Sequence, residues 1–242
     1  MRIPRGAVIA FLVAAAPAGA ALASDHHGVD EGLPIHIEDA FPISFRGVEL
    51  QVAGRGEALI DGPLRGTLHP ELKAGLFRNG HAWLGGTLAT DPDEHAAEGG
   101  VLVNFNAETP FLPAFSVAAR VAWGFSGLPD LTARGIVTRS FGVHRLHLNA
   151  EATWLGAAEG DESRLRPRLG VAGDRPFGLT TLALVGVSVT GGALQDLEGL
   201  LEAGLRHQLD PDQVLSVGVG LGWAGAAEAL APAMSVGYSR SF

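Results

Sequence analysis

The sequence predicts an all-β protein, a transmembrane antiparallel up-and-down β-barrel of about twelve strands, within a range of roughly ten to fourteen. Three observations predict it. Apolar and polar side chains alternate along most of the chain, and this period of two is that of a strand. Short turns alternate with longer loops, as in outer-membrane barrels. The last alternating run ends on an aromatic residue, Phe242.

Residues 1–23 have the organisation of a secretory signal peptide. Arg2 and Arg5 form a positive region, residues 7–16 form an apolar run, and small residues precede the expected cleavage near Ser24. The apolar run is too short to cross a bilayer as a helix. The sequence has no cysteine, which excludes a disulfide framework and an acyl-anchored lipoprotein. We therefore expect export.

Residues 24–47 are polar, interrupted by proline and without a sustained period, and they predict an irregular arm on the periplasmic side. His26, His27 and His36 could bind a transition metal, because imidazole and nearby carboxylates together suit Zn²⁺ or Cu²⁺. Their spacing is not that of a known metal motif, and a solvated tail is the alternative. We predict no metal and no other cofactor.

Residues 48–242 are expected to form the barrel. Residues 145–154 alternate most regularly, whereas residues 182–189 are apolar on both faces and Ile136 is an apolar residue on a polar face. Short turns are expected at residues 78–80 and 210–213, and longer loops at residues 91–100, 126–130, 157–163, 190–196 and 224–232. The expected strands are residues 48–59, 68–76, 81–90, 101–106, 116–125, 131–140, 145–154, 164–171, 182–189, 201–209, 215–223 and 234–242.

Composition favours a membrane barrel over a soluble periplasmic β-sandwich that binds ligands, which is the alternative fold. The chain has 34 glycines, a positive mean hydropathy and only 18% charged residues. A sandwich would carry more lysine and glutamate on its outer face. The net charge of −9 argues against a nucleic-acid partner, which would require clustered basic residues.

The final strand carries Val236, Tyr238 and Phe242 on one face. It resembles the closing strand of bacterial outer-membrane barrels, which the assembly machinery recognises. Arg240 departs from this pattern, because the corresponding position usually carries an apolar or aromatic residue. The resemblance implies that the assembly machinery and outer-membrane lipid are partners of this chain.

A second resemblance extends from about residue 37 to Phe242. It is carried by residues 69–72, 75–76, 79–80, 145–150, 202–209 and 214–220. These segments resemble the outer-membrane transporters named for phenol degradation by the meta-cleavage pathway. The resemblance implies a barrel that passes small aromatic or otherwise hydrophobic compounds, and it defines no substrate residues.

The polar faces of the strands would line the lumen. Glu71 and Lys73 belong to them, and the candidate lumen-lining residues are Arg120, Arg134, Arg145, His147, Glu151, Arg164, Arg166, Arg168, Glu202 and Arg206. An excess of arginine would favour anions or carboxylated aromatic compounds. Alternatively, these groups pair with one another and close the interior, because an unpaired buried charge is costly.

We therefore expect a Gram-negative outer-membrane channel for small hydrophobic, aromatic or anionic compounds, with the cargo unidentified. The alternatives are a closed structural or adhesion-type barrel and the soluble sandwich. Enzymatic function is not expected. Ser140 and His144 flank one short turn, but the sequence contains no nucleophile elbow, zinc-protease motif or phosphate loop.

Overall fold

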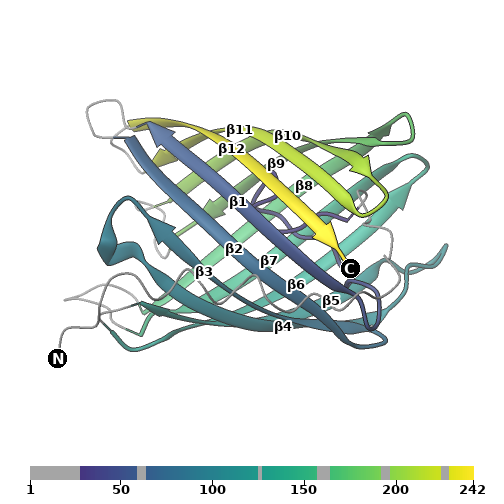
Figure 1. Ribbon diagram of the computed structural model, residues 1–242, viewed down its shortest axis with the longest axis horizontal. Coiled ribbons are helices and arrows are strands. Elements are labelled where there is room, and N and C mark those ends of the chain that lie inside the picture. Colours follow the sequence, from purple (N-terminus) through teal and green to yellow (C-terminus); the bar gives the residue numbers. More distant parts are fainter. Residues whose placement is uncertain (1–27, 59–63, 125–126, 157–163, 192–196, 225–228) are drawn as a thin grey trace.

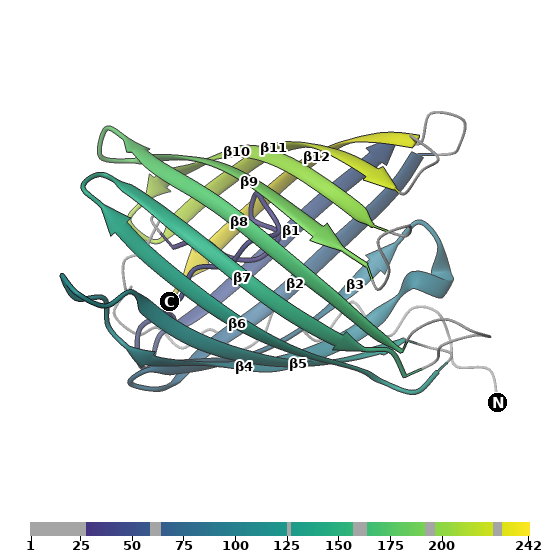
Figure 2. The same ribbon diagram turned by 180° about the vertical axis from the view of Figure 1, so that it is seen from behind.

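The computed structural model describes residues 28–58, 64–124, 127–156, 164–191, 197–224 and 229–242. The predicted signal peptide, His26 and His27 lie outside these residues. Twelve antiparallel strands form a closed barrel in which each strand pairs with its neighbours in the sequence and β1 closes on β12 (Figures 1 and 2). The predicted barrel and strand number are confirmed, and the β-sandwich alternative is wrong.

The strands are long and of similar length, as a barrel wall requires. They are β1 (Val48–Ala58), β2 (Leu64–Phe77), β3 (Gly80–Ala89), β4 (Ala96–Asn106), β5 (Ala114–Gly124), β6 (Asp130–Phe141), β7 (His144–Trp154), β8 (Leu165–Phe177), β9 (Thr181–Thr190), β10 (Glu198–Asp210), β11 (Gln213–Ala224) and β12 (Ala229–Ser241). A 3₁₀ turn, η2 (Pro92–Glu94), lies between β3 and β4. Among the described residues no helix is long and apolar enough to cross a membrane.

The two ends of the barrel differ in the length of their connections. At one end, the turn end, strands are joined by residues 78–79, 142–143, 178–180 and 211–212, and by the longer segment 107–113. At the other, the loop end, the connections are residues 59–63, 90–95, 125–129, 155–164, 191–197 and 225–228. Several strands begin earlier than expected, and the difference is largest for β4 and β12, which start at Ala96 and Ala229, five residues before the expected positions, and pair there with neighbouring strands.

The outer surface is apolar between two aromatic belts. Outward side chains near the loop end include Trp123, Trp154 and Trp223, and those near the turn end include Phe105, Phe115, Phe141 and Phe177. The 11 residues of β7 extend about 33 Å along the strand. At a tilt of about 40° this is roughly 25 Å along the barrel axis, the height of the apolar band in membrane barrels. The wall therefore matches the hydrocarbon core of a bilayer.

Residues 28–47 are called the arm below. Its buried part, residues 29–40, lies inside the barrel, as the purple segment in Figures 1 and 2 shows, whereas Phe41 and residues 44–46 are exposed at the turn end, where β1 begins. The polar, proline-interrupted sequence of this segment predicts an arm on the periplasmic side, and the side of the membrane from which it enters the barrel stays a prediction. The arm is largely buried between Val29 and Ala40, so a solvated tail does not describe this part of it.

Apolar side chains of the arm pack in two clusters against the lumen wall. Val29, Ile35 and Ile37 contact a wall patch formed by Ala172, Leu182 and Leu184. Ala40 packs against Leu102, Ala114, Ala118 and Ile136. These contacts explain the irregularities of the sequence pattern, because Ile136 and the inward residues of β9 face the arm instead of water.

Candidate functional site

Two carboxylates of the arm bind cations on several strands. Asp30 accepts from Lys73 Nζ on β2 at 2.6 Å and from Arg206 Nη1 on β10 at 3.2 Å. Glu31 lies 2.6 Å from Arg134 Nη2 on β6, and 3.6 and 3.8 Å from the guanidinium groups of Arg168 on β8 and Arg120 on β5. The arm is thereby held across the lumen by ion pairs to both sides of the barrel.

The backbone of the arm is also bound to the wall. The amide of His36 donates to Glu202 at 2.8 Å, and its Nδ1 lies 2.8 Å from the same carboxylate. The amide of Glu38 donates to Asn149 at 2.9 Å, and the Asn149 amide donates back to the Glu38 carbonyl at 2.8 Å. Wall side chains thus satisfy polar backbone groups that this irregular segment buries.

A track of inward glycines on β8 to β12 makes room for the arm. A Cβ atom at Gly237 would collide with the Leu33 side chain, one at Gly204 with the ring of Pro34, and one at Gly170 with Ile37. Gly186 and Gly218 lie similarly close to Ile35 and Pro34. The inner wall is therefore shaped to the side chains of the arm between residues 33 and 37.

The structure places most predicted lumen residues on the inner face. Buried there are Arg134, His147, Glu202 and Arg206, and partly buried are Arg120, Arg145, Glu151 and Arg168. Arg164 and Arg166 are exposed near the loop end, where Arg166 pairs with Glu198 at 3.1 Å. Arg134 pairs with Glu151 and with Glu38, the latter at 3.0 Å, so several predicted residues form one network.

A second buried network lies beside Ala40. His147 Nε2 is 2.8 Å from Asp174, whose carboxylate also accepts from Arg145 at 2.6 Å. His147 Nδ1 is 3.0 Å from the Thr138 hydroxyl, which accepts the Ala40 amide at 2.9 Å. These groups bind each other and the arm, which gives them a structural role in the described state.

Several carboxylates of the lumen are not among the residues predicted from the sequence. Glu49, Glu98 and Asp174 are buried on the inner face, and the arm adds Asp30, Glu31, Glu38 and Asp39. Strict alternation in β1, β4 and β8 could have found the first three, whereas nothing local indicates that the arm enters the barrel. The described lumen therefore lacks the arginine excess that favoured an anionic cargo.

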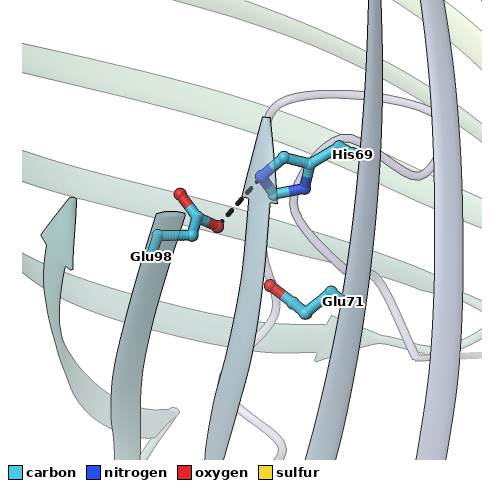
Figure 3. Close-up of side chains that lie close together, drawn as sticks. All are labelled: His69, Glu71 and Glu98. Carbon is cyan, nitrogen blue, oxygen red and sulfur yellow. Dashed lines mark ion pairs between the residues drawn. The ribbon is translucent and has the colours of Figure 1, made fainter. Parts of the chain in front are cut away.

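A cavity of about 230 Å³ lies beside the arm. Glu31, Gly32, His36 and Glu38 of the arm line it on one side. The facing wall comes from β1 to β5 and β12, and includes Arg55, His69, Glu71, Lys73, Trp83, Thr87, Glu98 and Arg120. His69, Glu71 and Glu98 converge on this wall, as Figure 3 shows, and all three were missed as a group by sequence analysis.

The remaining candidates lie at the turn end. The Ser140 hydroxyl donates to Glu108 at 2.7 Å, so its described hydrogen bond is to a carboxylate and not to His144. On β12, Val236 is exposed on the outer face and Tyr238 is partly buried, as is Phe242, which follows the strand. Arg240 points outward and lies 3.1 Å from Asp212, which gives this atypical residue a partner at the rim.

No protein-family model and no curated protein matches the chain. Among solved structures, an outer membrane channel from Pseudomonas putida F1 aligns with a TM-score of 0.65 at 11% identity, over 88% of this chain and all of that one. The NanC porin aligns with a TM-score of 0.62 at 10% identity, over 79% and 98% of the two chains.

The CymD monoaromatic hydrocarbon channel aligns less closely, with a TM-score of 0.50 at 8% identity over 82% of this chain and 89% of that one. At such identities the comparisons establish the fold and not the cargo. The chain has the β-barrel fold of outer-membrane channels and porins.

Proposed function

We propose that this protein is an outer-membrane channel for small molecules, and that the arm closes its lumen until it is displaced. The single observation that carries the proposal is an irregular segment bound inside a barrel that has a cavity beside it. A barrel of about eight strands is filled by its own strand side chains, whereas wider barrels leave room inside. Here the filling is a terminal segment, which can move without breaking any strand pairing.

The contacts of the arm are of a kind that can exchange with water. Most are ion pairs and hydrogen bonds to lumen side chains that become solvated when the arm leaves. The lumen wall would then expose Lys73, Arg134 and Arg206, whose partners include arm carboxylates, beside Glu151 and Glu202. We infer a polar passage of mixed charge in the open state.

For the cargo, we propose small compounds with an aromatic ring. Trp83 lines the cavity beside Arg120, so the wall offers a ring face next to a guanidinium group. The resemblance to the transporters named for phenol degradation supports the same class. Location in the outer membrane of a Gram-negative cell, after export by the signal peptide, is part of this proposal.

The test is conductance in planar bilayers, comparing the complete mature chain with a variant that lacks residues 28–44. We expect the truncated barrel to conduct at least about tenfold better, because the lumen loses its filling. If the truncated protein folds, as judged by its gel mobility before and after boiling, and still does not conduct, the closed structural alternative is correct.

A disulfide tether provides a second test in the full-length chain. Leu33 of the arm lies directly against Gly237 of the lumen wall, and the sequence has no cysteine. In the variant Leu33→Cys/Gly237→Cys, we expect oxidation to hold the barrel shut and reduction to restore conductance. Equal conductance in both redox states would show that passage does not require the arm to move.

A further inference from the structure

The cavity wall brings three metal-ligating side chains together, and the strand register explains how. Glu71 on β2 pairs with Gly85 on β3, and Gly85 pairs with Glu98 on β4. Because the central residue of this row has no side chain, the two carboxylates approach each other above it. His69 lies two residues from Glu71 on the same face of β2, so its imidazole reaches the same place (Figure 3).

We propose that His69, Glu71 and Glu98 bind a divalent transition-metal ion of the Zn²⁺ type. One ligand atom from each side chain lies within 4.8 Å of the other two. One imidazole and two carboxylates form a donor set that suits Zn²⁺ and related ions, and three protein ligands leave one position open. The open position would face the cavity of about 230 Å³ and hold water or a cargo group.

The cations nearby leave these carboxylates available. Lys73 Nζ lies 3.4 Å from Glu71 but 2.6 Å from Asp30, which is therefore its main partner. Arg120 lies 3.9 Å from Glu98 and 3.8 Å from Glu31, beyond hydrogen-bond distance in both cases. Within the part of the chain that the structure describes, the Nε of Arg120 is buried and has no hydrogen-bond partner. An ion would therefore not have to displace a tightly bound arginine or lysine.

The contact that changes on metal binding is the one between His69 and Glu98. Nε2 of His69 lies 2.9 Å from Oε1 of Glu98. A metal ion inserted between them would take the lone pair of the imidazole nitrogen and release any proton held there, so binding weakens as the pH falls. Arg120 and Lys73 would then act as outer partners that orient the carboxylates.

The site does not rest on the proposed channel function, because binding is measured at equilibrium on the closed barrel. The experiment is calorimetric titration of the folded protein in detergent with Zn²⁺, and with Co²⁺ followed by visible absorption. His26 and His27 are replaced by glutamine throughout, so that the N-terminal residues outside the described structure cannot contribute.

In the parent protein, which carries the glutamine replacements of His26 and His27, we expect one ion to bind per chain. The visible absorption spectrum of bound Co²⁺ should be typical of an ion with a low coordination number. His69→Gln and Glu98→Gln should each weaken binding by at least about tenfold, while His144→Gln, at an exposed turn, should bind like the parent. Each variant is first shown to be folded by its heat-dependent gel mobility. Absence of binding in the parent, or binding unchanged by both substitutions, would overturn the proposal.

Discussion

At the scale of single residues, glycine decides where the arm lies. Gly170 and Gly237 face the lumen, and their missing side chains leave space that Ile37 and Leu33 occupy. Gly220 and Gly222 also face the lumen but do not contact the arm: a Cβ there would meet its nearest neighbours at 3.5 and 3.6 Å, which is ordinary contact. Both pairs of glycines therefore lie on the inner wall, but only Gly170 and Gly237 contact the arm.

This difference predicts that Gly170→Ala/Gly237→Ala loosens the arm and that Gly220→Ala/Gly222→Ala does not. Overpacking costs about 1–3 kcal/mol, so we expect roughly a tenfold larger fraction of released arm. Cleavage by a glutamate-specific protease in detergent measures the fraction of molecules with a released arm, since Glu31 and Glu38 are in the arm. Equal cleavage of the two double variants would mean that the glycine track does not seat the arm.

Two irregularities in the alternating sequence pattern are caused by the arm, but the period of the strands alone does not explain them. Ile136 breaks the polar face of β6, and residues 182–189 are apolar on both faces, as sequence analysis recognised. Both observations have one cause on the inner face, because Ile136 packs on Ala40, while Leu182 and Leu184 pack on Ile35 and Ile37. An apolar residue on a lumen face is a signal of a partner inside the barrel, but the sequence does not identify that partner.

At the scale of elements, β12 closes the barrel. The Phe242 amide donates to the Val48 carbonyl at 2.8 Å, beside the β1–β12 ladder that begins at Glu49 and Ser241. Phe242 thus lies at the end of the seam between the first and last strands. Arg240 is on the outer face, 3.1 Å from Asp212 of the β10–β11 turn, with its guanidinium 5.2 Å from the Phe242 ring.

We predict that deletion of Phe242 lowers the folded, heat-modifiable fraction in the outer membrane several-fold, because the seam loses its last backbone pair and the aromatic end of the assembly signal. Arg240→Ala is the matched control and should assemble at the parental level, since its ion pair is exposed and contributes little. Membrane fractionation followed by gels with and without boiling measures both. Normal assembly after deletion would show that Phe242 is not part of the signal.

At the scale of the whole molecule, some features follow from local sequence patterns, whereas others depend on contacts between residues far apart in the sequence. Strand number and the asymmetry of the two ends follow from period two and from turn residues, which are local, and both were predictable. The position of the arm depends on pairs such as Glu31 with Arg134, His36 with Glu202 and Asp30 with Arg206, separated by 103, 166 and 176 residues. No local pattern specifies such contacts, so the filled lumen became visible only in three dimensions.

The tryptophans of this protein can be used to test which face of the barrel contacts lipid. The chain has four tryptophans. Trp123, Trp154 and Trp223 are exposed on the outer face near the loop end, whereas Trp83 lines the cavity inside. In bilayers containing brominated lipid, a variant that retains only Trp154 should lose most of its fluorescence, and one that retains only Trp83 should be barely quenched.

The replaced tryptophans become phenylalanine in both variants, which keeps the aromatic belts and makes the two proteins directly comparable. Quenching of Trp154 alone requires a barrel that sits in the bilayer with a lumen sealed from lipid. Strong quenching of both would mean that lipid reaches the cavity wall. Quenching of neither would mean that the outer face does not contact the hydrocarbon core, and the channel proposal would have to be abandoned.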